Sequence, residues 1–372
     1  MDIVYLGTSR IHRNRANLVQ TLHTVAAIHR LKVNIKLYLP PKKSGLDVKK
    51  RLEDFGIKEN LPVYFSSFLH SRWKRLNYFP FILIYKKMLK RTKHVYIRSP
   101  QLSLALIKYR IPHHLEIHDV DTLKKEKWLY PIVHAHRNRL INWLFPISLS
   151  AANQLVNYGA DKKRIKVLPS GVDLSLFNTI KPVNFDELKK VPKIFYIGRI
   201  SKSRGLKIFE KVARLNLGEV NLVGEAEDTI SCDSNLKYHG PVVHRRVPKY
   251  YEQSHIILLP YQTNLEHINS ISPIKLFEAM ASGRAIIVSN IPPVREIVTH
   301  EKEALLVDPE DENGWIEAIE RLKNDIELTK KICENAKIKV QKYSWEERAK
   351  KIIRTLNLKV DPNGYKTSSG AS

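Results

Sequence analysis

The chain has 372 residues, of which 43% are hydrophobic and 27% are charged, and its formal net charge is +26. This hydrophobic fraction supports packed cores, and the length predicts two domains rather than one. The two cysteines, Cys232 and Cys333, have neither metal-site nor redox-motif spacing, so we expect inert thiols in a reducing compartment. The first residues predict a strand and not a signal peptide. No apolar run reaches the roughly eighteen residues that span a bilayer, which argues against a transmembrane helix.

The positive charge is concentrated in the N-terminal half of the chain. Residues 1–180 carry a net charge of +21, whereas residues 181–372 carry +5. Such an asymmetry indicates an anionic partner for the N-terminal half, either nucleic acid or an acidic membrane surface. No nucleic-acid-binding motif accompanies the charge, so we expect no nucleic acid and favour the membrane surface. The expected location is cytoplasmic, peripheral to the inner face of the cell membrane.

Strands and helices alternate from the N-terminus. The loop after the first strand, residues 7–15, lacks a glycine-rich dinucleotide fingerprint but lies where an open α/β sheet binds ligands. It is either a solvated surface loop or a source of donors for phosphates or hydroxyls, and its candidate residues are Gly7, Arg10, Arg13 and Asn17. In this half, strands are expected at 3–6, 33–39, 94–98, 115–119 and 145–148, and helices at 16–28, 100–110, 122–144 and 151–158.

A basic and aromatic segment covers residues 71–93. It holds eight basic residues and no acidic residue, with five aromatic side chains interleaved. Lysine and arginine beside aromatic and aliphatic residues suit the headgroup region of an anionic bilayer. The alternative is a buried amphipathic helix with a charged outer face, and the lack of balancing acidic residues favours the membrane. The candidate membrane-facing residues are Arg72, Trp73, Lys74, Arg75, Lys86, Lys87, Lys90 and Arg91.

The same alternation starts again in the second half. Strands are expected at 194–197, 220–223, 236–241, 256–259 and 285–288, and helices at 205–215, 248–253, 272–283 and 311–355. Two such series predict an α/β protein with two doubly wound, Rossmann-like domains facing across a cleft. The expected divisions are an N-terminal domain at 1–175, a linker at 176–192 and a C-terminal domain at 193–345. Residues 346–372 are expected to form the end of a C-terminal helix and a disordered tail.

The short helix over 272–283 contains a local conflict. Ser272 is the expected N-cap, Pro273 the first helical residue and Gly283 the C-terminal stop. Lys275 places a cation in the first turn, where the helix dipole is already positive. Either this side chain extends to solvent, or a bound anion resolves the conflict at the helix start.

Two further cations are expected at the same edge of the second sheet. Arg199 follows the first strand of that sheet through Gly198, and Arg204 comes directly before the next helix. Together with Lys275 they bring three cations and two helix starts toward one point, which suits a diphosphate. Glu278, one turn after Lys275, is placed to accept two hydroxyls of a ribose.

Four segments of the sequence can be compared with known families by their order and spacing. They are Leu-Glu-Ile-His-Asp at 115–119, Val-Leu-Pro-Ser-Gly-Val-Asp at 167–173, Tyr-Ile-Gly-Arg at 196–199 with Arg-Gly at 204–205, and Ser-Pro-Ile-Lys-Leu-Phe-Glu-Ala-Met-Ala-Ser-Gly at 272–283. In these segments the chain resembles the retaining glycosyltransferases of family 4 (glycosyl transferases group 1), which have the GT-B fold. The resemblance covers nearly the whole chain and is strongest between residues 165 and 300.

This resemblance implies an N-terminal acceptor-binding domain and a C-terminal domain that binds a nucleotide-sugar donor. By it, Arg199 and Arg204 hold the donor diphosphate, and Glu278 holds the ribose. His118 lies beside the transferred sugar. The implied catalytic residues are His118, Arg199 and Arg204, and the implied donor-binding residues are Arg199, Arg204, Ser272, Pro273, Ile274, Lys275 and Glu278.

The chain departs from the family pattern at three places. Arg204 stands where the family usually has lysine, which keeps the charge but changes the geometry. Ser270 stands where the common pattern has a first glutamate, and a subset of the family with a similar Ser-Pro-x-Lys sequence also lacks that glutamate. The Gly-Gly pair of the first loop is absent. The missing glutamate leaves the donor sugar unassigned.

The activity implied is retaining transfer from a nucleotide-diphosphate sugar to a lipid-linked or cell-envelope glycan acceptor, as in polysaccharide biosynthesis. No metal and no cofactor are expected, because the cationic cluster supplies the countercharge. Asp119 and Asp121 form an Asp-x-Asp pair, but they lie in the other domain and lysines follow them. His113, His114, His134 and His136 are weak metal candidates. The alternatives are another GT-B enzyme, such as a nucleotide-sugar epimerase, and a basic nucleic-acid-binding protein.

Overall fold

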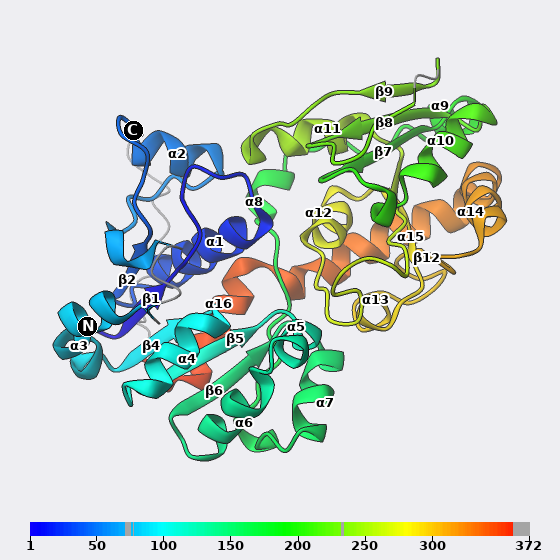
Figure 1. Cartoon of the computed structure of the whole chain (residues 1–372). Coiled ribbons are helices and arrows are strands. Elements are labelled where there is room, and N and C mark those ends of the chain that lie inside the picture. Colours follow the sequence, from blue (N-terminus) through cyan, green and yellow to red (C-terminus); the bar gives the residue numbers. More distant parts are fainter. Residues whose placement is uncertain (71–75, 77, 232–233, 360–372) are drawn as a thin grey trace. The chain divides into compact units, whose positions relative to one another are not determined.

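The computed structural model describes residues 1–70, 76, 78–231 and 234–359 (Figure 1). These residues form two compact units: Met1–Pro169 with the described chain from Trp345 onward, and Ser170–Ser344. This division differs from the expected one. Residues 170–175 and the expected linker at 176–192 belong to the second unit, whereas the last helix belongs to the first. Of the expected disordered tail, residues 360–372 lie outside the described residues.

The first unit contains a six-stranded parallel sheet in the order β3-β2-β1-β4-β5-β6. The order reverses between β1 and β4, and such a switch point is the usual ligand edge of a doubly wound sheet. All five expected strands are present, and β3 is additional. The strands are β1 Ile3–Leu6, β2 Ile35–Leu39, β3 Val63–Phe65, β4 His94–Ile97, β5 His113–Ile117 and β6 Ile141–Pro146.

Helices cover both faces of this sheet. The last helix of the described chain packs against the first, and the rings of His23 and Trp345 stack between them with centroids 5.6 Å apart (Figure 1). The helices are α1 Ala16–Arg30, α2 Val48–Asp54, α3 Phe79–Arg91, α4 Pro100–Lys108, α5 Val120–Lys125, α6 Leu129–Arg137, α7 Leu149–Asn157 and α16 Trp345–Thr355, with 3-10 turns η1 Ser67–Leu69 and η3 Lys162–Arg164.

The second unit repeats the architecture, with a six-stranded parallel sheet in the order β12-β11-β10-β7-β8-β9. Its switch point lies between β7 and β10. The five expected strands are present, and β12 is additional. The strands are β7 Lys193–Ile197, β8 Glu219–Val223, β9 Leu236–Tyr238, β10 Ile256–Leu259, β11 Ala285–Ser289 and β12 Leu305–Val307.

Three helices of the second unit, α10, α11 and α12, pack against the strands of its sheet. The helices are α8 Leu174–Phe177, α9 Phe185–Lys190, α10 Leu206–Arg214, α11 Val247–Gln253, α12 Ile274–Ser282, α13 Pro292–Arg295, α14 Glu312–Asn324 and α15 Ile326–Lys339, with 3-10 turns η4 Lys202–Arg204, η5 His244–Arg246 and η6 Val340–Tyr343. In the described ranges, no helix combines the length and the apolar character that crossing a bilayer requires.

The expected linker is instead part of the second core. Phe177, Val183 and Leu188 are all buried in the same apolar cluster as the strands of the second sheet. Burying apolar side chains stabilises folding by about 25 cal/mol per Å² of apolar surface. The three buried side chains therefore hold this segment against the second core. The short α8 and α9 made the segment look irregular in sequence.

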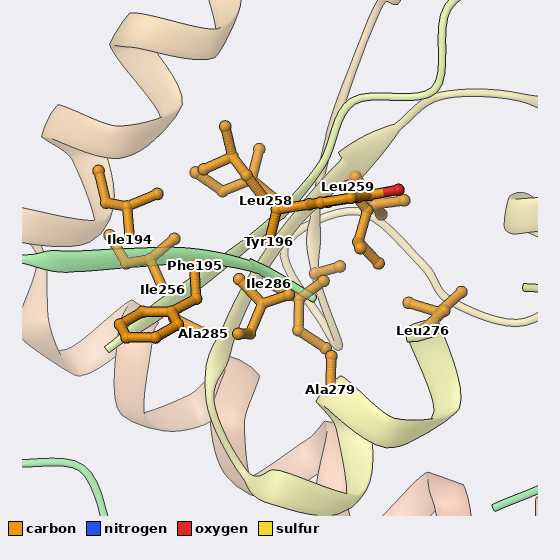
Figure 2. Close-up of a cluster of buried hydrophobic side chains, with 14 of the residues drawn as sticks. Ile194, Phe195, Tyr196, Ile256, Leu258, Leu259, Leu276, Ala279, Ala285 and Ile286 are labelled. Carbon is orange, nitrogen blue, oxygen red and sulfur yellow. The ribbon is translucent and has the colours of Figure 1, made fainter. Parts of the chain in front are cut away.

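Strands and helix α12 share one apolar core in the second unit. Leu276 and Ala279 lie on the side of α12 that faces the strands carrying Tyr196, Leu259 and Ile286 (Figure 2), and all five are buried. Because this face of α12 is fixed by packing, the polar residues on its other face are held at defined positions beside the ends of β7 and β10.

Candidate active site

The turn after β7 and the start of α12 meet at the switch point of the second sheet. Gly198 has φ +152°, and a Cβ atom there would lie 1.6 Å from Cε of Lys275. Only glycine therefore leaves room for the lysine side chain to cross this turn. The ammonium lies 5.8 Å from the centre of the Tyr196 ring, within cation–π range.

Three cations face this turn. Burial and the nearby positive charges of Arg204 and Arg199 lower the pKa of Lys275 to about 8, although Glu278 opposes the shift. The structure therefore brings together Lys275, Arg199 and Arg204, as the sequence predicts. Such a cluster carries unfavourable like-charge repulsion unless an anion is present.

Glu227 supplies one anion to this cluster, and this residue was not predicted from the sequence. Its two carboxylate oxygens lie 3.2 Å from Nη1 of Arg199 and 3.3 Å from Nη1 of Arg204. Arg204 also donates to Oγ of Ser201 at 2.9 Å. Glu227 is 44% exposed, so these ion pairs are open to solvent and to exchange for another anion.

The start of α12 differs from its prediction. Pro273 is the N-cap, Ile274 the first helical residue, and no side chain caps the helix. Ser272 does not act as the cap, because its Oγ accepts a hydrogen bond from the backbone N–H of Ser170 at 2.8 Å. The N–H groups of Ile274 and Lys275 therefore have no side-chain cap and suit another acceptor, whereas that of Leu276 donates to the carbonyl oxygen of Pro273. Gly283 ends the helix in the left-handed region, at φ +65°, as predicted.

Glu278 lies one turn deeper on α12 and is 5% exposed. It accepts a hydrogen bond from Nε2 of His244 at 2.9 Å and another from the Tyr251 hydroxyl at 3.3 Å. Burial and this carboxylate raise the pKa of Tyr251 well above 10, so its hydroxyl stays a donor. A carboxylate can accept about four hydrogen bonds, so two positions remain for a ligand. His244 was missed, since a histidine in a loop after a strand carries no distinctive signal.

In the first unit, His118 follows β5 at the carboxyl edge of the sheet, with 22% of its side chain exposed. Its Nε2 lies 2.5 Å from Oε1 of Glu116, which is completely buried. Glu116 also accepts hydrogen bonds from Nε2 of Gln20, the Tyr96 hydroxyl and Nη2 of Arg348, each at 2.6 Å. Sequence reasoning singled out the histidine and missed the buried carboxylate beside it.

The charges of this pair are well defined. Burial and the positive charge of Arg98 lower the pKa of His118 to about 4, although Glu116 opposes the shift. Burial raises the pKa of Glu116, but Arg348 and His118 beside it hold that pKa well below its usual range. At neutral pH the imidazole is therefore uncharged and the carboxylate is ionised.

The first loop, residues 7–15, follows β1 at the same edge of the sheet. A Cβ atom at Gly7 would lie 2.6 Å from Cδ2 of Leu39, so a larger residue there would require the leucine side chain to shift. The carbonyl oxygen of Asn17 accepts a hydrogen bond from Arg98 at 2.7 Å, and its buried Oδ1 lacks a hydrogen-bond partner. Arg10 contacts the ring of His70. Arg13 is exposed at the surface.

A buried arginine that was not predicted, Arg51 of α2, braces this loop. It donates to the carbonyl oxygens of Ile11 and Arg13 and to Oδ1 of Asn14. The loop backbone is thus fixed by one guanidinium, whose planar set of five donors suits several acceptors at once.

Helix α3 carries the described part of the expected membrane-facing set. Arg72, Trp73, Lys74 and Arg75 lie outside the described residues. Lys86, Lys87, Lys90 and Arg91 are exposed, whereas Phe81, Ile82 and Leu89 are buried on the opposite face. Phe79, Leu83 and Ile84 are also exposed, at 45%, 62% and 56%. The outer face of α3 is therefore both basic and apolar.

The described residues contain no group of three or more histidine, cysteine, aspartate or glutamate side chains arranged to hold a metal ion. In the Asp-x-Asp pair, Asp119 caps α5 by accepting a hydrogen bond from the Thr122 N–H at 3.1 Å. Asp121 pairs with Lys124 at 3.6 Å. Both carboxylates thus have structural partners.

Residues 191–325 match the glycosyl transferases group 1 family, and this range contains Arg199, Arg204, Lys275 and Glu278. This match lies within the second unit. Among curated relatives, a D-inositol 3-phosphate glycosyltransferase of Paenarthrobacter aurescens is 25% identical over 215 residues, 52% of this chain and 51% of the relative. The chain thus spans about half the length of the curated relatives it matches.

Two solved structures share the fold over nearly the whole chain. HepE of Anabaena, in complex with UDP and glucose, has a TM-score of 0.72 at 18% identity and covers 96% of this chain and 99% of its own. Sucrose-phosphate synthase from Thermosynechococcus elongatus has a TM-score of 0.75 at 16% identity, with coverages of 96% and 98%. The predicted GT-B fold is confirmed.

Proposed function

We propose that the protein is a glycosyltransferase that moves a sugar from a nucleotide-diphosphate sugar to an acceptor hydroxyl. The observation that carries this proposal is the meeting of Arg199, Arg204 and Lys275 at the uncapped start of α12, with Glu278 one turn deeper. Three cations and free N–H groups suit a diphosphate, and a carboxylate with unused acceptor capacity suits a ribose. The family match and the likeness to HepE support the same donor class.

We further propose a retaining, front-face mechanism that uses no metal. The bond between the sugar C1 and the leaving phosphate oxygen breaks as the acceptor oxygen bonds to C1 on the same face. The leaving phosphate takes the proton of the acceptor hydroxyl. Arg199 and Arg204 stabilise the negative charge that gathers on the diphosphate, and removing one such donor typically costs 10²- to 10³-fold in rate, about 3–4 kcal/mol.

The acceptor proposal rests on α3. Its exposed apolar residues, Phe79, Leu83 and Ile84, lie in the first half of the helix, and its four exposed cations lie in the second half. An apolar end with a basic end suits docking on an anionic bilayer, where each cation contributes roughly 1 kcal/mol. We infer that the enzyme works at the inner membrane face on a lipid-linked or envelope glycan.

The donor proposal is tested by screening nucleotide sugars for thermal stabilisation, since a ligand that prefers the folded state raises its stability. We expect one nucleotide class to stabilise the protein and Arg199→Ala to lower transfer by roughly 10²- to 10³-fold without unfolding it. Arg214→Ala, an exposed arginine at the end of α10, is the matched control. Normal turnover of Arg199→Ala at low donor concentration would contradict the site, and epimerisation of the donor without an acceptor would favour the epimerase alternative.

The membrane proposal is tested by flotation with anionic vesicles. Replacing Lys86, Lys87, Lys90 and Arg91 by serine is expected to weaken vesicle binding while hydrolysis of the donor in water changes little. The control replaces four exposed lysines of the same unit, Lys49, Lys50, Lys162 and Lys163, with the same loss of charge. Equal weakening in both variants would point to net charge alone, and binding to nucleic acid instead of vesicles would overturn the proposal.

A further inference from the structure

Strand β5 carries polar side chains at alternating positions. His114 and Glu116 alternate along β5, a buried strand between β4 and β6 of the parallel sheet, and His118 directly follows its last residue. Such strands are normally apolar throughout, because both faces of a parallel sheet are covered. A fully buried carboxylate at Glu116 is costly unless it is neutralised and hydrogen-bonded, so its surroundings need a specific reason.

The hydrogen bonds of Glu116 determine the proton position on His118. Oε1 accepts from Gln20 and His118, and Oε2 accepts from Tyr96 and Arg348. An ionised carboxylate can only accept, so each of its four partners must donate. Nε2 of His118 therefore carries the proton, and Nδ1 is left with its lone pair. In this state the imidazole can accept a hydrogen bond from a hydroxyl but cannot donate one through Nδ1.

Arg348 keeps this arrangement in place. It comes from α16, is 3% exposed, and donates through Nη2 to Glu116. Through Nη1 it donates to the carbonyl oxygens of Leu168 and Pro169, and through Nε to Oγ1 of Thr24. A lysine has one ammonium and cannot reach these separated acceptors together. The guanidinium is thus held rigidly and keeps Glu116 ionised despite its burial.

We propose that Glu116 and Arg348 are positioning residues of the transferase. They fix His118 in the tautomer whose free Nδ1 accepts a hydrogen bond from a hydroxyl of the bound sugar. This inference rests on the proposed function. The charged groups around His118 are Glu116 on β5, Arg98 directly after β4 and Arg348 on α16. The two arginines disfavour a protonated imidazole, which suits an acceptor of hydrogen bonds and not an acid.

The test uses a double variant that removes both charges of the buried Glu116–Arg348 ion pair. Glu116→Gln alone leaves Arg348 buried without its counter-charge, and this variant is at risk of unfolding. The double variant Glu116→Gln with Arg348→Met is expected to fold, since replacing a whole buried ion pair is often tolerated. Glu303→Gln is the matched control, a buried glutamate of the second unit that pairs with Lys339 at 3.1 Å.

The first readout is the tautomer of His118, measured by ¹⁵N NMR of the full chain labelled at histidine and assigned with His118→Asn. We expect the Nε2–H form in the wild type and in Glu303→Gln, with no change between pH 5.5 and pH 8. In the double variant a glutamine amide can either donate or accept, so we expect a mixture of tautomers. An Nδ1–H form in the wild type, or an unchanged single tautomer in the double variant, would overturn the proposal.

The second readout separates sugar recognition from nucleotide binding. In the double variant we expect turnover of the nucleotide sugar to fall by about 2- to 10-fold, the usual effect of losing one hydrogen bond between uncharged groups. Affinity for UDP or GDP alone should stay within about twofold of the wild-type value, since neither nucleotide carries the transferred sugar. Unchanged turnover with mixed tautomers would contradict the role in sugar binding. A wild type that shows the Nε2–H form but binds no nucleotide sugar would contradict the proposed function and leave the positioning of His118 standing.

Discussion

Each unit places a buried glutamate beside a histidine at the carboxyl edge of its sheet, but the two glutamates differ in how fully they are bonded. Glu116 accepts four hydrogen bonds, from Gln20, Tyr96, His118 and Arg348, at 2.5–2.6 Å. Glu278 accepts two, from His244 at 2.9 Å and from Tyr251 at 3.3 Å.

The difference separates a structural carboxylate from one that can bind a ligand. Glu116 uses its full acceptor capacity on hydrogen bonds within the protein, and an arginine is its counter-charge. It can therefore position the groups that donate to it, but it cannot accept a further hydrogen bond from a ligand. Glu278 has unused capacity and lies beside a cluster of three cations. The number of bonds already made, rather than burial, distinguishes the two roles, since both carboxylates are almost fully enclosed.

Stability is expected to show the largest contrast between the two glutamates. Glu116→Gln leaves Arg348 buried without a charged partner and should lower the free energy of unfolding by about 3–5 kcal/mol. Glu278→Gln keeps an acceptor oxygen for one neighbour and turns an NH2 group toward the other, where a neutral His244 ring or the Tyr251 hydroxyl can accept, so it should cost no more than about 1 kcal/mol. Chemical denaturation of both variants measures this. Similar losses of unfolding free energy in the two variants would contradict the assignment of Glu116 as the structural carboxylate and Glu278 as the one that can bind a ligand.

For use of the nucleotide-sugar donor, the direct effect is expected at Glu278, the glutamate whose substitution costs less stability. Glu278→Gln is expected to lower kcat/KM for the nucleotide sugar by about 10- to 100-fold, because a hydrogen bond to a charged group is worth about 1.5–3 kcal/mol. A donor with a 2′-deoxyribose gives a sharper measurement. The wild type should discriminate against it, and Glu278→Gln should discriminate much less. Equal discrimination by both proteins would separate Glu278 from the ribose.

The pH dependence of nucleotide binding tests the cation cluster. With a pKa of about 8, Lys275 is charged below pH 8 and loses its proton as the pH rises above it. An anion favours the charged form, so affinity for a nucleoside diphosphate should be highest below pH 8 and fall by about three- to tenfold by pH 9. Lys275→Met should bind more weakly at pH 7 and lack this decline. A decline that persists in Lys275→Met would come from another group.

The smallest expected effect concerns Glu227, which pairs with Arg199 and Arg204. Glu227→Gln removes this competitor and should tighten binding of a nucleoside diphosphate by about two- to fivefold, since exposed ion pairs contribute at most about 1 kcal/mol. Glu320→Gln, an exposed glutamate of α14 with the same charge change, controls for the general field. Weaker binding by Glu227→Gln would show that the carboxylate supports the arginines.

Much of the fold could be predicted from the sequence, because buried parallel strands form short apolar runs separated by helices. The two strands that were missed, β3 and β12, have three residues each and lie at the edges of their sheets. The residues around α8 and α9 were interpreted as a linker because their elements are short. Their burial depends on the neighbouring core, which no local pattern reveals.

Residues of the candidate site could be predicted to lie together where they belong to one segment or to one edge of a sheet. Arg199, Arg204 and Lys275 come together because the carboxyl ends of parallel strands share one edge. Partners from distant segments could not be predicted. Ser272 was wrongly interpreted as a cap because its hydroxyl binds Ser170, 102 residues away. The alternating polar positions of β5 were a usable signal for Glu116, but nothing local indicates Arg348.

The return of the last helix to the first unit has a consequence for biosynthesis. Glu116 leaves the ribosome 232 residues before Arg348, and the whole second unit is synthesised between them. Domains generally fold as units during synthesis, so the second unit can form its core while the first still lacks α16. Until translation reaches that helix, the nascent first unit has a carboxylate at its centre without the guanidinium that neutralises it. The order of synthesis therefore predicts that the N-terminal half of this chain completes its folding last.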